Sequence, residues 1–183
     1  MRFLALALLT LFVPAVPASD RVPAPQAVTR PAAAEKAAIA FSRANDELWA
    51  YLKKGLTYLE SPTPLKPAEA VAPTYVHPDG RGFGAYGFSP EAYEDVQRLY
   101  PYFRAYSWDQ VLASQKLYDL ANRALCDWML KSLRGYIPPA ASKRDVFLVL
   151  HKAWNLGVGG FKKGREVVPS RTRRAEEFLR LNG

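Results

Sequence analysis

The sequence feature that most restricts the possible fold is a glycine- and aromatic-rich stretch at residues 79–90. It reads DGRGFGAYGFSP and holds four of the chain's eleven glycines. Glycine has no Cβ atom, so it adopts positive φ angles and lets other groups approach the backbone closely. The interleaved Phe83, Tyr86 and Phe88 supply flat apolar rings and one hydroxyl group. The pattern indicates an irregular segment, either a surface for a ring-shaped ligand such as a sugar or an ordinary ordered turn.

A helical pattern at residues 31–59 precedes this stretch. Four leucines recur on one face of its second half: Leu48, Leu52, Leu56 and Leu59. We expect the helix to stop at Ser61, because Pro62 disfavours helical geometry in the residue before it. Glu60 then lies on the last turn, where the helix dipole favours cations rather than acids. This unfavourable placement makes a functional role for Glu60 more plausible.

Helical patterns also follow the glycine-rich stretch. They cover residues 90–99, 108–133, 144–155 and 171–181. A serine precedes each of them, as is typical of helix N-termini: Ser89, Ser107, Ser142 and Ser170. In the last helix, we expect Ala175, Phe178, Leu179 and Leu181 to face inward. Many helices and one glycine-rich loop, with room for a short β-hairpin, predict a mainly α domain.

The N-terminus has the composition of an export signal. Arg2 is followed by an apolar run to Val13 and by small residues up to Ala18, which predicts a cleaved signal peptide at residues 1–18. An uncleaved membrane anchor is the alternative, although the run is short for a bilayer span and no later segment approaches that length. Residues 19–31 are rich in proline and alanine and predict a linker. The folded domain is expected at residues 32–183, in a secreted or periplasmic protein.

The formal net charge of +8 implies an acidic partner. Anionic envelope polymers and lipid surfaces suit an exported protein, and nucleic acid does not. The basic residues gather in segment 162–174, which is either a solvated face or a contact for such a polymer. Cys126 is the single cysteine, which excludes an internal disulfide and predicts a buried thiol. His77 and His151 have no Cys, Asp or Glu cluster around them, so we expect neither a metal nor a cofactor.

Three short motifs occur in an informative order. Glu60-Ser61 ends a helical pattern, Gly84-Ala85-Tyr86-Gly87-Phe88 follows in the loop, and Ala153-Trp154-Asn155-Leu156-Gly157 comes far downstream. This order resembles the lysozyme-like domain of lytic transglycosylases and goose-type lysozymes, over roughly residues 46–181. That family has an α+β lysozyme-like fold and cleaves peptidoglycan. Its Glu-Ser pair carries the catalytic acid, a Gly-Leu-Met-Gln type segment follows, and an Ala-Tyr-Asn-x-Gly type segment closes the site.

The resemblance implies roles for individual residues. Glu60 is the general acid/base, since a carboxylic acid kept protonated by burial can deliver a proton to the leaving oxygen. Trp154 stacks on a sugar, and Asn155 hydrogen-bonds an N-acetyl group or Glu60. The implied substrate-binding residues are Ser61, Gly84, Ala85, Tyr86, Phe88, Trp154 and Asn155. Glu69 is an alternative acid, although it lies in a proline-rich loop and lacks a following serine.

Asp79 decides which reaction is expected. One acid supports a lytic reaction, in which a hydroxyl group of the substrate attacks and an anhydro-sugar forms, whereas a hydrolase needs a second carboxylate or a positioned water. Asp79 is the candidate for that second group, and an Asp-Gly turn is the alternative interpretation. The family glutamine is also missing, because Ser89-Pro90 follows Phe88.

Three functional hypotheses follow. The first is an exported glycosidase, a lytic transglycosylase or lysozyme-like enzyme, that cuts the MurNAc-GlcNAc β-1,4 bond of peptidoglycan. The second is a catalytically impaired module of the same fold that binds glycan or a partner envelope protein, which the missing glutamine and the long spacing from Glu60 to Gly82 favour. The third is an unrelated exported helical protein.

Overall fold

The computed structural model describes residues 46–60 and 71–182. The predictions for the leader, the linker, Ser61 and Glu69 lie outside these ranges. Helices dominate the described part of the chain, so the mainly α prediction is confirmed. The α-helices are α2 (Asp46–Glu60), α3 (Pro90–Leu99), α4 (Trp108–Leu112), α5 (Gln115–Ser132), α6 (Lys143–Lys162) and α7 (Pro169–Asn182). Short 3₁₀ helices are η2 (Gly84–Tyr86), η3 (Pro101–Ala105) and η4 (Arg134–Tyr136).

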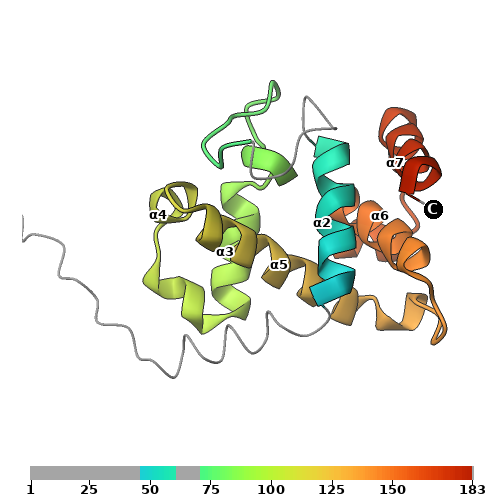
Figure 1. Ribbon diagram of the computed structural model, residues 1–183. Coiled ribbons are helices and arrows are strands. Elements are labelled where there is room, and N and C mark those ends of the chain that lie inside the picture. Colours follow the sequence, from blue (N-terminus) through green and yellow to red (C-terminus); the bar gives the residue numbers. More distant parts are fainter. Residues whose placement is uncertain (1–45, 61–70, 183) are drawn as a thin grey trace, which may run out of the picture.

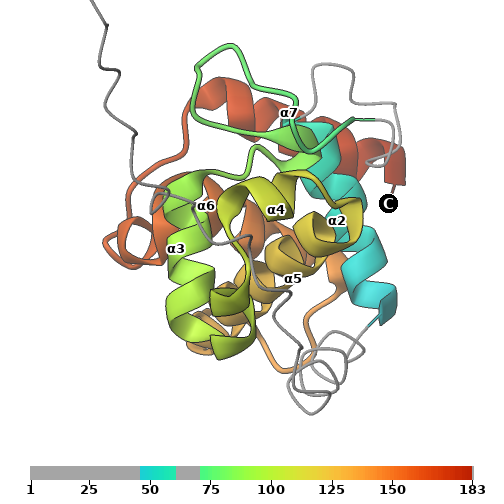
Figure 2. The same cartoon turned by 90° about the vertical axis from the view of Figure 1, so that its left-hand side faces the viewer.

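Two helices organise the rest. Helix α5 packs against α3, α4 and α6, whereas α2 packs against η2, α6 and α7. Figure 1 shows α3 and α4 on one side of α2, and α6 and α7 on its other side. The loop that carries the glycine-rich stretch lies near the C-terminal end of α2, and the view in Figure 2 places it at the same end of the molecule. The last residues of α2 therefore lie between this loop and α7.

The leucine face of α2 enters the core as expected. Leu52, Leu56 and Leu59 are buried, and Leu48 is half-buried. Burying one leucine side chain contributes about 2 kcal/mol by area alone. Helix α2 approaches α6 closely at Gly55, where an added Cβ atom would lie 2.3 Å from Cε2 of Phe147. This close contact sets the position of α2 along α6, and therefore the position of its last turn in the domain.

Serine caps set several helix starts, as the sequence predicts. The Ser89 hydroxyl accepts a hydrogen bond from the Ala92 N–H at 3.2 Å, with Pro90 in the first helical position. Ser107 and Ser142 each form a capping box with the residue three positions later. These caps are local, since donor and acceptor lie within one turn, which is why they can be recognised from sequence.

Three helix predictions are wrong in part. Segment 108–133 is two helices, because the chain leaves helical geometry after α4 and the Ser114 hydroxyl caps α5 by accepting from the Leu117 N–H. Helix α6 continues to Lys162, with one non-helical residue, Gly157, at φ 68° and ψ 160°. Helix α7 starts at Pro169, which places Ser170 inside it, and Leu181 is exposed rather than inward.

The glycine-rich loop contains little β-structure. Phe83 forms isolated antiparallel bridges with Val76 and with Phe88, and no longer strand occurs in the described ranges. The predicted hairpin is thus reduced to single pairs, because η2 fills the connection between Phe83 and Phe88. Cys126 is buried, as expected. None of the helices in the described ranges is long and apolar enough to cross a membrane.

Candidate functional site

Glu60 is the last residue of α2, and its side chain is only 7% exposed. The last turn of α2 contains no basic residue that would offset the partial negative charge of the helix end. A buried carboxyl group at this position is costly unless other elements supply partners for it. Those partners come from the glycine-rich loop and from α7.

The backbone of the glycine-rich loop lies directly against the Glu60 carboxyl group. Gly87 follows η2 with φ 62°, a left-handed conformation that favours glycine. A Cβ atom added to Gly87 would lie 3.0 Å from Oε2 and 3.3 Å from Cδ of Glu60. The backbone angle therefore favours glycine here, and a side chain at this position would press against the Glu60 carboxyl group. Gly87 belongs to the second of the three motifs, and Glu60 belongs to the first.

Tyr118 of α5 holds the loop in place. Its hydroxyl group donates to the Phe83 carbonyl oxygen at 2.6 Å and accepts from the Tyr86 N–H at 3.1 Å. Its ring stacks on the Tyr86 ring, with centroids 5.3 Å apart. An added Cβ atom at Gly84 would lie 2.6 Å from the Tyr118 hydroxyl oxygen. The position of Gly87 against Glu60 thus depends on a tyrosine from another element.

Two arginines of α7 reach the end of α2 from the opposite side. Nη1 of Arg171 lies 2.6 Å from Oε2 of Glu60 and donates to the Leu59 carbonyl oxygen at 3.0 Å. Nη2 of Arg174 donates to the Tyr58 carbonyl oxygen at 2.7 Å. These contacts satisfy carbonyl groups that a helix C-terminus leaves without intrahelical partners. Helix α7 therefore supplies the positive charge that the last turn of α2 lacks.

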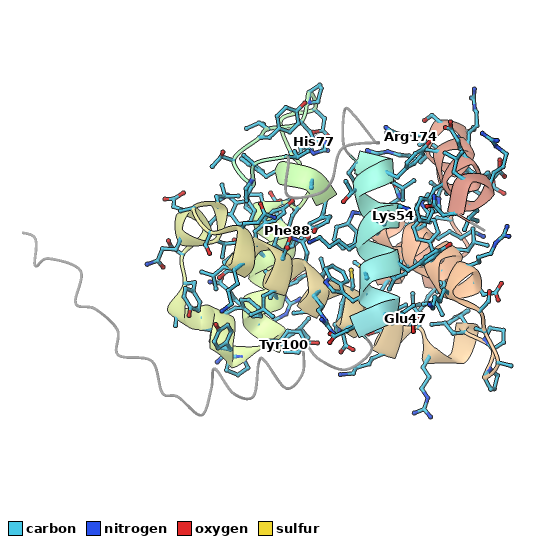
Figure 3. The ribbon with its side chains drawn as sticks, viewed as in Figure 1. Glu47, Lys54, His77, Phe88, Tyr100 and Arg174 are labelled. Carbon is cyan, nitrogen blue, oxygen red and sulfur yellow. The ribbon has the colours of Figure 1, made fainter. Side chains whose placement is uncertain are left out.

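Burial raises the pKa of Glu60 above its ordinary value, because the charged form is desolvated. The Arg171 guanidinium opposes this shift most strongly, followed by the charges of His77 and Arg174. Figure 3 shows His77 and Arg174 on opposite sides of the end of α2. His77 is also part of the loop structure, since its Nε2 lies 2.7 Å from the Gly84 carbonyl oxygen. The site thus contains a carboxyl group whose pKa is raised despite its cationic neighbours.

Asp79 uses its carboxylate in a local turn. It is exposed, and its Oδ1 accepts hydrogen bonds from the N–H groups of Arg81 and Gly82 at 3.0 and 3.3 Å. These two bonds lower the pKa of Asp79 and define a local Asx turn. The turn interpretation of this residue therefore holds, and the expectation of a catalytic role is not supported by its contacts.

The loop residues predicted to bind substrate are mostly buried. Gly84, Ala85, Tyr86 and Phe88 all lie in the interior. The Phe88 ring packs against Trp108, with centroids 5.7 Å apart, and the Tyr86 hydroxyl donates to Asp119 at 2.8 Å. The expectation that Tyr86 and Phe88 offer their rings to a sugar is wrong, because those rings are used to pack the loop onto α5.

The downstream motif lies close to the loop but makes different contacts from those expected. Trp154 is half-buried, and its Nε1 donates to the Tyr86 carbonyl oxygen at 3.2 Å. The Asn155 side-chain amide donates to the His151 carbonyl oxygen at 2.9 Å and lies 3.2 Å from Nδ1 of the same histidine. Of the two alternatives expected for Asn155, the bond to Glu60 is not formed by this amide nitrogen, which is engaged within α6, and the bond to an N-acetyl group stays a prediction.

The basic segment 162–174 divides between two faces. Arg171 points to the end of α2, whereas Arg173, two residues on, faces a cavity of about 810 Å³ beside α6 and α7. That cavity also contains Lys152 and Arg165, together with two glutamates. A single solvated face, as predicted from the sequence, therefore describes only part of the segment.

Several important residues were not identified from the sequence, namely Arg171, Arg174, Tyr118 and His77. A usable signal existed for the arginines: positions 171, 174, 175 and 178 share one helical face, and Ala175 and Phe178 are apolar. Nothing in the pattern around Tyr118 distinguishes it from a core tyrosine. Among the described residues, no group of three His, Cys, Asp or Glu side chains is placed to hold a metal ion.

Comparison with known proteins found no relative of this chain. No family model, curated protein or solved structure matches this chain.

Proposed function

We propose that this protein is an exported glycosidase that cleaves peptidoglycan, with Glu60 as its single catalytic carboxyl group. The observation that carries the proposal is the contact between the buried Glu60 carboxyl group, at the end of a core helix, and the left-handed turn at Gly87. This contact joins two of the motifs that resemble the lysozyme-like domain. Burial raises the pKa of Glu60, which suits a group that must deliver a proton near neutral pH.

The proposed reaction is lytic cleavage of the MurNAc-GlcNAc β-1,4 bond. Glu60 protonates the oxygen of the leaving sugar as the glycosidic bond breaks. The resulting carboxylate then accepts the proton of a hydroxyl group of the same substrate while that hydroxyl oxygen attacks the anomeric carbon, which closes an anhydro ring. The exposed Asx turn at Asp79 favours this route over hydrolysis, since the carboxylate expected to act as the second group is engaged by the Arg81 and Gly82 N–H groups.

The proposed partners follow from the same chemistry. Peptidoglycan glycan strands are the substrate, and the protein reaches them outside the cytoplasm, through the leader predicted at residues 1–18. The excess of positive charge suits an envelope rich in anionic polymers. Neither a metal nor a cofactor is needed for this reaction.

A second candidate function is a catalytically impaired module of the same fold that binds glycan or an envelope protein. The observation that favours it is the ion pair of 2.6 Å between Arg171 and Oε2 of Glu60, because such a pair stabilises the ionised carboxylate. The missing family glutamine after Phe88 points the same way. Binding to insoluble peptidoglycan without release of soluble fragments would identify this function.

Release of dye from labelled peptidoglycan tests the enzyme proposal. We expect the protein of residues 19–183 to release dye and the Glu60→Gln variant to lose at least about 100-fold of that rate, as is usual when a general acid is removed. The matched control is Glu94→Gln, which changes an exposed glutamate on α3 in the same way and is expected to keep full activity. Equal rates for the protein and its Glu60→Gln variant, with both folded by circular dichroism, would overturn the assignment.

A further inference from the structure

Arg171 contacts one of the two carboxyl oxygens of Glu60. Nη1 of Arg171 lies 2.6 Å from Oε2, the same oxygen that lies nearest the turn at Gly87. The same nitrogen donates to the carbonyl oxygen of Leu59, the residue before Glu60. One guanidinium group thus contacts both the Glu60 carboxyl group and the backbone carbonyl of the preceding residue. Such a two-point contact restrains rotation of the carboxyl group.

From this geometry we infer that Arg171 is a positioning residue, which holds Oε2 of Glu60 so that Oε1 is the oxygen that exchanges the proton with substrate. The inference rests on the proposed function, and it adds α7 to a site that the sequence motifs place on α2, the glycine-rich loop and α6. Glu60 loses its proton when it protonates the leaving oxygen, and the paired guanidinium offsets the negative charge formed at that moment. The same carboxylate then recovers a proton from the attacking hydroxyl group, so no further reactant is required.

The charges around Glu60 come from several elements. Arg171 and Arg174 belong to α7 and His77 belongs to the loop, whereas Tyr118 of α5 is a titratable neighbour whose pKa is raised by burial. Arg171 has the largest opposing effect on the burial that raises the pKa of Glu60. Removing its charge should therefore raise that pKa further, because an adjacent cation favours the ionised carboxylate.

The test compares Arg171→Met, Arg171→Lys and the control Arg173→Met. Arg173 is an exposed arginine on the same helix that faces the cavity beside α6 rather than α2. The first readout is NMR titration of the Glu60 side-chain carboxyl carbon, which needs no activity. The second is the pH profile of peptidoglycan cleavage. For a group that must be protonated to act, the alkaline limb of this profile follows its pKa.

The expected results separate charge from geometry. Arg171→Met moves the Glu60 titration and the alkaline limb to higher pH and lowers kcat about tenfold. Arg171→Lys keeps the charge but replaces the planar guanidinium group by a shorter, more flexible amine, so its titration stays near that of the parent while kcat falls. Arg173→Met matches the parent in both readouts. If Arg171→Met does not fold, Arg171→Lys and Arg171→Gln provide the same comparison.

The two proposals fail in different ways. If the parent cleaves peptidoglycan and the Arg171 variants change neither kcat nor the Glu60 titration, Arg171 has no positioning role and the proposed function stands. If no protein cleaves peptidoglycan but the Glu60 titration moves as expected, the proposed function is wrong and the Arg171 contact is structural, which also overturns the inference of a positioning role.

Discussion

Gly87 combines a left-handed backbone conformation with a direct contact to the Glu60 carboxyl group. Its positive φ angle and the 3.0 Å between its added Cβ atom and Oε2 of Glu60 both select glycine. The sequence predicted a close backbone approach in this stretch and left open whether its rings form a sugar-binding surface or pack an ordered turn. The rings of Tyr86 and Phe88 are buried. What lies against Glu60 is the bare backbone of the turn.

Gly87→Ala should therefore damage the site more than the fold. The left-handed backbone costs an alanine about 1–2 kcal/mol, and the new methyl group displaces the Glu60 carboxyl group as well. Gly80→Ala is the matched control, since Gly80 has φ 72° but no atom within 4 Å of an added Cβ atom. Urea unfolding should show similar losses for the two variants, whereas cleavage should fall only in Gly87→Ala. Equal cleavage by the two variants would show that the contact with Glu60 has no functional effect.

At the scale of elements, the site depends on contacts between segments that are far apart in sequence. Helix α7 caps the end of α2 through Arg171 and Arg174, and α5 holds the loop through Tyr118. Sequence patterns predicted the helices and most of their serine caps, because those signals are local. They did not predict these pairings, because a lone arginine or tyrosine carries no information on which distant carbonyl group it meets.

Tyr118→Phe tests the support of the loop. It removes the hydroxyl group that bonds both Phe83 and Tyr86, and leaving buried partners unsatisfied costs about 1–3 kcal/mol. Tyr93→Phe is a suitable control, since the Tyr93 hydroxyl donates to the carbonyl oxygens of Phe103 and Tyr106, away from Glu60. Both variants should lose stability in urea unfolding, but only Tyr118→Phe should also lose cleavage at temperatures where it is folded. Full cleavage by folded Tyr118→Phe would contradict this role.

At the scale of the whole molecule, the sequence predicted a mainly α domain and the main helices, and it identified Glu60 at the end of a core helix. It did not predict the break at Ser114, because the apolar stripe from Val111 to Leu117 continues across it. Nor did it predict that α6 resumes after Gly157. Both outcomes depend on how the flanking segments pack. The spacing of apolar residues in the sequence carries no information on that packing. The bonds of Asn155 within α6 were missed for the same reason.

His151 makes the stability of the whole domain dependent on pH. Burial is the main cause that lowers its pKa to about 4, from an ordinary value near 6.5. Above pH 6.5 the imidazole is neutral in both the folded and unfolded states, so it adds no pH dependence. Between pH 6.5 and about 4 the unfolded state binds the proton and the folded state does not, so the free energy of unfolding falls as pH falls.

The measurement is urea unfolding of the parent and of His151→Gln between pH 4 and pH 7. We expect the parent to lose stability toward pH 4 and the variant to lose less over the same range. Glu60 has the opposite sign, because its raised pKa makes its burial more costly as pH rises. Its contribution is thus separable by the Glu60→Gln variant. An identical pH dependence for the parent and His151→Gln would contradict the burial of a neutral imidazole.

The most direct test of the central claim is mass spectrometry of the fragments that the protein of residues 19–183 releases from purified peptidoglycan, with Glu60→Gln treated in parallel. A lytic reaction at Glu60 predicts fragments ending in anhydro-MurNAc from the parent and none from the variant. Fragments with reducing ends would contradict the lytic route and require a water-activating group. Fragments released equally by both proteins would contradict the role of Glu60. If a folded parent binds peptidoglycan but releases no fragments, the protein is a binding module rather than an enzyme.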